Sequence, residues 1–240
     1  SIREQSRMSL KTRFGNLRDV LDSNSYQESV FVMDSPVVTN SIFNKMLKFG
    51  KEELVIIDCS FSTNENALKE NIRRIQGEAE AAVLSGKQHI VLTDKYTDET
   101  RVSIPMILAT AAVHSFLTRK GIRSFISLHV QSAECLDTHY FAVLIGVGAT
   151  TVNPYLAQEC IRERHEKGLF KDYTYEECVE RYKKAVDQGL LKIMAKLGIS
   201  VVSAYRGGFN FEVVGLSRSM VNEYFIGVQS RISGIGLSGV

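Results

Sequence analysis

The stretch LVIIDCSF, residues 54–61, predicts a strand covered on both faces, because its run of apolar, β-branched residues is nearly continuous. Four more candidate strands follow at roughly regular intervals along the chain. They are QHIVLTDK (88–95), SFISLHVQ (124–131), TTVN (150–153) and ISVVSAY (199–205). This series of strands predicts that a β-sheet forms the centre of the chain.

Segments with helical spacing of apolar residues fill the intervals between the strands. They are residues 65–86, 104–120, 136–145 and 175–197, with shorter helices at 41–50 and 218–227. Alternating strands and helices predict parallel strands joined by right-handed crossovers. Five such units are too few for a closed eight-stranded barrel. We therefore expect a partial, TIM-barrel-like α/β fold with the helices packed outside.

Composition limits the class of protein. The chain has 240 residues, of which 29 are basic and 27 acidic, and the two signs are well mixed. The sequence has no stripe of basic residues, so it does not predict binding to nucleic acid. Its longest apolar runs are shorter than the roughly 20 residues that span a membrane. The first residue is Ser1, no signal-peptide core follows, and the last residues are glycine-rich. We expect a cytoplasmic piece of a longer polypeptide.

The short motifs of the sequence do not by themselves indicate a cofactor site, a metal site or a catalytic nucleophile. GIGLSG at 234–239 matches a dinucleotide fingerprint literally, but no strand precedes it, so we interpret it as part of a linker. The five histidines lack metal-ligand spacing. The four cysteines are far apart, so reduced thiols are expected, with a distant disulfide as the alternative. Cys59 follows a predicted strand and is interpreted as a small buried residue.

Polar residues gather where the predicted strands end, which is where parallel α/β folds place their sites. These residues include Asp58, Ser60, Asp94, Gln131 and Asn153. The turn Arg206-Gly207-Gly208 follows the fifth predicted strand. Its backbone N–H groups and its arginine could bind an anion, such as the phosphate of a ligand, although a tight turn that needs glycine explains it equally well.

Several long stretches resemble the central domain of the glutamate synthase large subunit. DSPVVTN at 34–40 with VIIDCSF, and GEAEAAVLSGKQHIVLTD at 77–94, resemble its opening. HYFAVLIGVGATTVNPYLAQE at 139–159 is similar to its most distinctive block, and the segment from Tyr182 to Leu237 is similar to the approach to an FMN-binding domain. The resemblance covers essentially the whole chain in order.

The resemblance implies a parent enzyme that makes L-glutamate from L-glutamine and 2-oxoglutarate. An amidotransferase domain would release ammonia, and an FMN domain fed by an iron–sulfur cluster would use it, with a small electron-donor subunit or ferredoxin as a further partner. This chain would hold no cofactor of its own. Residues 1–33 would be the lead-in from the amidotransferase domain, residues 34–228 the central domain, and residues 229–240 the linker toward the FMN domain.

Two interpretations of function follow. In the first, the chain connects the two catalytic domains and helps to form the ammonia path, with Thr39, Asn40 and Ser60 facing that path or a domain interface. These three residues are assigned from their place in the family-like DSPVVTN and DCSF blocks. In the second, the chain is a free-standing partial-barrel enzyme or binding domain whose ligand has a phosphate group near Arg206, Gly207 and Gly208.

Overall fold

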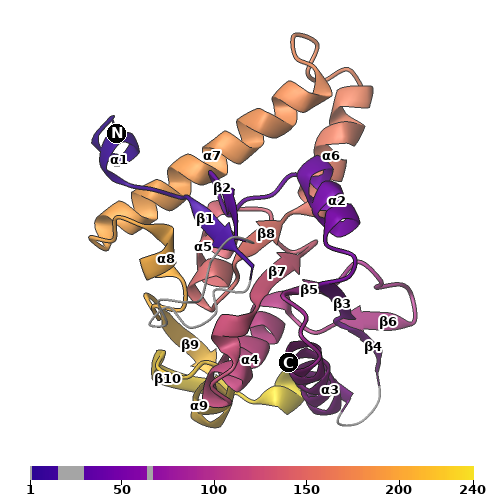
Figure 1. The fold of residues 1–240 in the computed structure, drawn as a ribbon, viewed down its shortest axis with the longest axis vertical. Helices are drawn as coiled ribbons and strands as arrows, with labels where there is room; N and C mark the ends of the chain where they lie inside the picture. The colour runs from indigo at the N-terminus through magenta and orange to yellow at the C-terminus, as the bar shows by residue number, and fades with distance from the viewer. Residues whose placement is uncertain (1, 16–29, 64–66) are drawn as a thin grey trace.

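The computed structural model describes residues 2–15, 30–63 and 67–240. Its centre is a parallel sheet of four strands in the order β3-β5-β7-β8 (Figure 1). The strands are β3 (Leu54–Asp58), β5 (His89–Thr93), β7 (Ser127–Gln131) and β8 (Thr151–Asn153). Each strand lies beside the one before it in the chain, which is the strand order of a β/α barrel. The expectation of a partial barrel is confirmed.

Three helices cover one face of this sheet. They are α3 (Ala67–Leu84), α4 (Met106–Arg119) and α5 (Thr138–Gly146). Successive side chains of a strand point to opposite faces, so Ile90 and Leu92 of β5 face these helices while His89, Val91 and Thr93 face away. Ile90 and Leu92 belong to the main apolar core and are fully buried.

The opposite face of the sheet, called the inner face from here on, is covered by other elements. Helix α2 (Asn40–Phe49) places Phe43 against Val38 and Val91 in a second apolar cluster. The antiparallel pair β1 (Thr12–Phe14) and β2 (Phe31–Met33) places Phe14 against the histidine rings of the sheet. The inner face is therefore enclosed.

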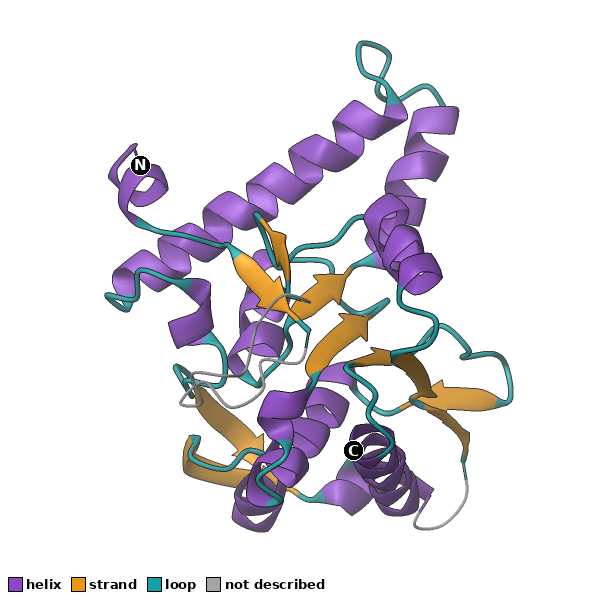
Figure 2. Cartoon of the chain, in the orientation of Figure 1, coloured by secondary structure: helices purple, strands orange, loops and turns teal. Residues whose placement is uncertain are grey.

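The remaining elements surround this centre, as the helices and strands of Figure 2 show. Beside the sheet, β4 (Ser60–Ser62) pairs with β6 (Arg101–Ser103), and a 3₁₀ turn spans Arg123–Phe125. The outer helices are α1 (Ile2–Arg7), α6 (Tyr155–Glu166), α7 (Tyr175–Lys196), α8 (Val202–Tyr205) and α9 (Arg218–Tyr224). The parallel pair β9 (Glu212–Leu216) and β10 (Gln229–Ile235) precedes a 3₁₀ turn at Leu237–Gly239.

The predicted fifth strand at 199–205 is wrong. Residues 202–205 form the short helix α8, and only Val201 makes a bridge, to Ser9. The free edge of β8 is taken instead by residues 36–38, where Val38 N–H donates to Val152 O and Val152 N–H donates to Pro36 O. No edge next to β8 is left for residues 199–205, whatever their β propensity.

The other predicted segments agree with the structure to within a few residues. The predicted helix 65–86 is described from Ala67 onward, because residues 65 and 66 lie outside the described part. The structure adds helix α6, which the sequence patterns did not predict. The division of the chain into a lead-in, a central domain and a linker stays a prediction, and residues 229–235 of the assigned linker form β10.

A substitution at Gly148, which lies between α5 and β8, tests how closely this turn packs against His114 of α4. The φ of Gly148 is +117°, and an added Cβ would lie 2.2 Å from His114 Nδ1. We expect Gly148→Ala to lower the free energy of unfolding by about 2–4 kcal/mol through backbone strain and overpacking. Gly168→Ala is the control, because Gly168 also has a positive φ but open space around it, and it should cost only about 1 kcal/mol. Equal losses in urea unfolding would contradict this account of Gly148.

Candidate functional site

The inner face of the sheet carries a set of polar side chains, called the inner row from here on. Alternation along each strand places every second residue of β5, β7 and β8 on this face. The members of the inner row are His89, Thr93, Ser127, His129, Gln131, Thr151 and Asn153. All are buried except Gln131, which is partly buried. Polar groups buried in this way need hydrogen-bond partners. Most members of the inner row bond to one another, while the hydroxyl of Ser127 bonds to the backbone of Gly15.

One chain of hydrogen bonds crosses the carboxyl ends of the strands and leaves the sheet at Asn40. Thr93 Oγ1 donates to Gln131 Oε1 at 2.8 Å, and Gln131 Nε2 donates to Asn153 Oδ1 at 3.1 Å. Asn153 Nδ2 then donates to Asn40 Oδ1 at 2.9 Å, and Gln158 Nε2 donates to the same oxygen at 3.1 Å. Asn40 therefore joins the sheet to helix α6.

Thr39 and Asn40 stand at the start of α2 because their sequence caps that helix. Thr39 has extended backbone angles, and its hydroxyl accepts from Ile42 N–H, as an N-cap residue does. Both residues line a hollow of about 400 Å³ between α2, α6 and α7, together with Gln158 and Tyr175. The structure thus brings two of the three predicted path residues together at one opening.

A second set of bonds lies deeper in the inner row. His89 Nδ1 is 3.1 Å from His129 Nε2, and His129 Nδ1 is 2.7 Å from Thr151 Oγ1. The ring of Phe14 lies edge-on to both histidine rings. Burial lowers the pKa of His89, and burial followed by the neighbouring His89 lowers the pKa of His129 well below its ordinary value. Both rings are neutral at neutral pH.

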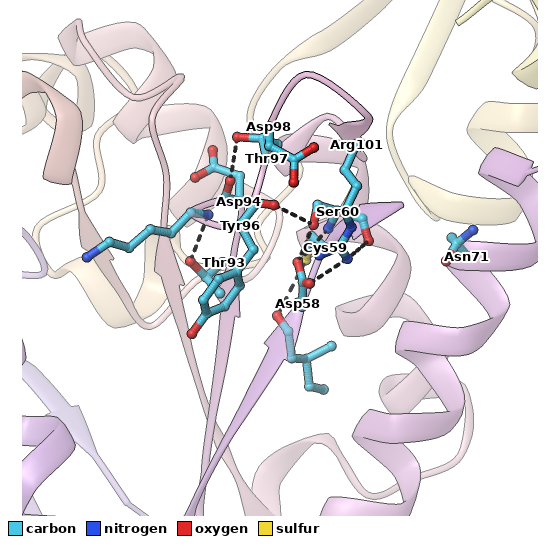
Figure 3. Close-up of polar contacts among 12 residues, drawn as sticks. Asp58, Cys59, Ser60, Asn71, Thr93, Asp94, Tyr96, Thr97, Asp98 and Arg101 are labelled. Atoms are coloured by element: carbon cyan, nitrogen blue, oxygen red, sulfur yellow. Dashed lines mark hydrogen bonds and ion pairs between the residues drawn. The ribbon is translucent and has the colours of Figure 1, made fainter. Parts of the chain in front are cut away.

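Ser60, the third predicted path residue, lies at the carboxyl end of β3 in another cluster (Figure 3). Its hydroxyl donates to Asp58 Oδ1 at 2.7 Å and is 3.3 Å from Tyr96 O. Arg101 forms an ion pair with Asp58 at 2.7 Å. Partial burial by itself raises the pKa of Asp58, but the hydrogen bonds from Ser60 and Arg101 outweigh it and lower that pKa. Ser60 is buried and does not line the hollow at Asn40.

Asp94, at the end of β5, is the other buried acid at this edge. Its carboxylate accepts from Ala133 N–H at 2.8 Å and from Ser132 Oγ at 3.2 Å, and Tyr155 bonds to it as well. Burial nevertheless raises the pKa of Asp94. These bonds hold the loop after β7 against the loop after β5, so Asp94 has a structural explanation.

Neither the thiol at the end of β3 nor the histidines and acids form a candidate reactive centre in the described residues. Cys59 is fully buried, and burial raises its pKa far above the ordinary value, so it is a core residue. None of the four cysteines is paired with another. Within the described residues, no group of three or more His, Cys, Asp or Glu side chains could hold a metal ion. No helix in that part is both long and apolar enough to cross a membrane.

The turn Arg206-Gly207-Gly208 lies at the opposite end of the strands from the one expected. Arg206 Nε donates to Ala149 O at 3.1 Å, just before β8 begins, because α8 replaces the predicted fifth strand. The N–H groups of Gly207 and Gly208 donate to Ile145 O and Tyr205 O. Anion binding at this turn stays a prediction, and it would have to come from the Arg206 side chain.

The sequence patterns name Asn40 and its partner Asn153 but not its other partner, Gln158, which lies in α6, a helix that no pattern predicts. They also do not pair His129 with His89 and Thr151. The alternation of polar residues in SLHVQ (127–131) was the available signal, because a period of two marks one face of a strand.

The buried histidines predict a loss of stability in mild acid. The pKa of His129 is lowered from 6.5, so below that pH the unfolded state binds a proton that the folded state does not. The free energy of unfolding should therefore fall as the pH drops from 7.5 to 5.5, by up to about 1.4 kcal/mol per pH unit for each such histidine. His129→Gln should flatten this slope in urea unfolding, while His139→Gln, at an exposed position, should leave it unchanged. An unchanged slope in His129→Gln would contradict the assignment.

Comparisons with known proteins agree with the sequence patterns. The family model described as the glutamate synthase central domain matches residues 1–217. The NADPH-dependent glutamate synthase large chain of Azospirillum brasilense is 53% identical over 242 residues, covering 100% of this chain and 16% of that protein. The ferredoxin-dependent glutamate synthase of Pyropia yezoensis is 36% identical over 249 residues, covering 98% of this chain and 16% of that protein.

A structural likeness exists to the flavin-binding domain of baker's yeast flavocytochrome b2, with 14% identity over 80% of this chain and 45% of that one. Its TM-score of 0.45 is too low to carry an argument. The family match and the relatives carry the assignment instead, and each relative extends far beyond the residues it shares with this chain. The chain belongs to the glutamate synthase central domain family.

Proposed function

We propose that this chain connects the glutaminase and FMN synthase domains of a glutamate synthase and helps to form the path along which ammonia travels between them. The parent enzyme would make L-glutamate reductively from L-glutamine and 2-oxoglutarate. This proposal extends the family assignment, because the chain corresponds to 16% of the Azospirillum relative and the catalytic parts would lie elsewhere. The partners would be the flanking domains of the same polypeptide and an electron donor such as ferredoxin.

The inner row is the observation that supports this role. Ammonia must stay unprotonated to react as a nucleophile, so a wall along its path should offer hydrogen bonds without supplying protons. Hydroxyls, amides and neutral histidines meet that requirement. Asn40 is the end of the bonded series, and it lines a hollow together with Thr39.

The same bonds offer a means of coupling the two reactions. Coupling between sites needs a contact that differs between two states of the protein. Asn40 bonds to Asn153 on the sheet and to Gln158 on α6, so a movement of α6 would change the side chains at the hollow. Thr39 and Asn40 are the path-facing residues that we propose, and Ser60 remains a weaker candidate at the edge near β4.

FMN and the iron–sulfur cluster are assigned to other parts of the parent enzyme. The four cysteines do not fit a cluster, because Cys59 and Cys135 are buried while Cys160 is exposed. The carboxyl edge of the sheet does not fit the phosphate of a flavin, because Asp58 and Asp94 place carboxyl groups there. In the free-standing alternative, the phosphate of the ligand would bind near Arg206 at the other end of the strands, while Asp58 and Asp94 are bonded within the fold.

The full-length enzyme with Asn40→Ala tests the path. Removing the amide leaves Asn153 and Gln158 without their shared acceptor and should reorganise the hollow. We expect glutamine-dependent synthesis to fall roughly ten-fold, equivalent to about 1.4 kcal/mol of barrier, while glutamine hydrolysis continues. The measurement is the number of glutamine molecules hydrolysed per pair of electrons consumed.

Asn71→Ala is the matched control, because Asn71 is also a partly buried helical asparagine with side-chain bonds but lies on α3. It should leave the ratio of hydrolysis to electron consumption at the wild-type value. An unchanged ratio in Asn40→Ala would exclude Asn40 from the ammonia path.

A further inference from the structure

A second hollow, of about 410 Å³, lies at the amino ends of the strands, away from the inner row's carboxyl edge. Its wall is rich in guanidinium and hydroxyl groups. The residues that carry the argument are Arg13, His114, Arg123, Ser124, Ser203 and Arg206. They come from β1, α4, the 3₁₀ turn after α4, and the α8 segment.

Neutral acceptors hold the two inner arginines in place. Arg123 donates to His114 Nδ1 at 3.0 Å, to Ile126 O at 2.8 Å and to Gly148 O at 2.8 Å. Arg206 donates through Nε to Ala149 O at 3.1 Å. Every one of these acceptors is uncharged, so the bonds orient the guanidinium groups but leave their charges uncompensated.

No carboxylate pairs with these arginines in the described part of the chain. The ion pairs found there involve other residues, and Arg13, Arg123 and Arg206 occur in none of them. Burial lowers the pKa of Arg123 to about 10, with the nearby Arg206 as a second cause, and burial lowers the pKa of Arg206 to about 10. Among the described residues, two like charges are therefore held together at a cost, which a bound anion would offset.

His114 adds a donor without adding charge. Its Nδ1 accepts from Arg123 Nε, so in the neutral ring the proton is on Nε2. Burial, followed by Arg123 and Arg206, lowers the pKa of His114 to about 3, so the ring stays neutral at physiological pH. The hydroxyls of Ser124 and Ser203 are exposed at the rim and make no hydrogen bond within the described residues.

We propose that this hollow is a binding site for a phosphate group, either as free phosphate or as the phosphate of a small ester. The donors come from several elements and surround the hollow, which suits a tetrahedral oxyanion better than a single planar carboxylate. Arg123 and Arg206 are already oriented by carbonyl groups, so a ligand need not order them. The hollow shares no lining residue with the one at Asn40, and its only member of the inner row is Ser127, at the amino end of β7.

Equilibrium dialysis of labelled inorganic phosphate against the full polypeptide that carries this chain tests the site. Ser203→Glu would place a carboxylate at the rim without removing any bond that holds the arginines. We expect this variant to bind one phosphate fewer per chain than the wild type. Ser219→Glu is the matched control, because Ser219 is also an exposed serine at the second position of a helix, and it should bind as the wild type does.

A second variant measures the contribution of charge. Arg13 is exposed, so Arg13→Gln should fold normally and weaken phosphate binding about three- to five-fold, the effect of one exposed charge. Competition by unlabelled phosphate and by a nucleoside monophosphate then separates the two sources, since an ester-binding site is emptied at lower concentrations of the nucleotide. Equal phosphate binding by wild type and Ser203→Glu, or no binding by the wild type at millimolar phosphate, would overturn the proposal.

Discussion

Residues 36–38 pair with β8 through two backbone hydrogen bonds, from Val38 N–H to Val152 O and from Val152 N–H to Pro36 O. These bonds place a segment that precedes β3 in the chain beside the last strand of the sheet. They also position Thr39 as the N-cap of α2 and bring Asn40 to Asn153. The cover that α2 provides, the bond from the inner row to Asn40 and the hollow at Asn40 all depend on this one pairing.

The two faces of the sheet bury different kinds of side chain. The face toward α3, α4 and α5 is a close-packed apolar core in which Ile90, Leu92 and Leu128 are fully buried. The inner face is also buried, but polar side chains occupy much of it. A buried polar group costs free energy unless it is bonded, and the inner row satisfies this by bonding along the sheet from β5 to β8. Such a face stabilises the fold less than an apolar one, which is consistent with a functional reason for it.

The two ends of the sheet also differ in charge. Asp58 and Asp94 lie at the carboxyl ends of the strands, where Asp58 pairs with Arg101 of β6 and Asp94 joins the loops after β5 and β7. Arg123 and Arg206 lie at the amino ends, where carbonyl groups near the α5–β8 connection hold them. Parallel α/β folds usually place their chemistry at the carboxyl ends. In this chain two arginines that have no carboxylate partner among the described residues lie together at the other end.

The sequence by itself determined the class of the fold and most of the central strands and helices. Local patterns suffice there, because the run LVIIDCSF and the helical spacing in residues 67–84 report burial directly. The long resemblance identified the family, and it singled out Asn40. Only the tertiary structure decided that ISVVSAY is not a fifth strand, because an edge of the sheet can be occupied once and residues 36–38 occupy it. Only the tertiary structure placed Arg206 beside Arg123 and joined Asn40 to Gln158, because these contacts link residues far apart in the chain through packing that no local pattern encodes.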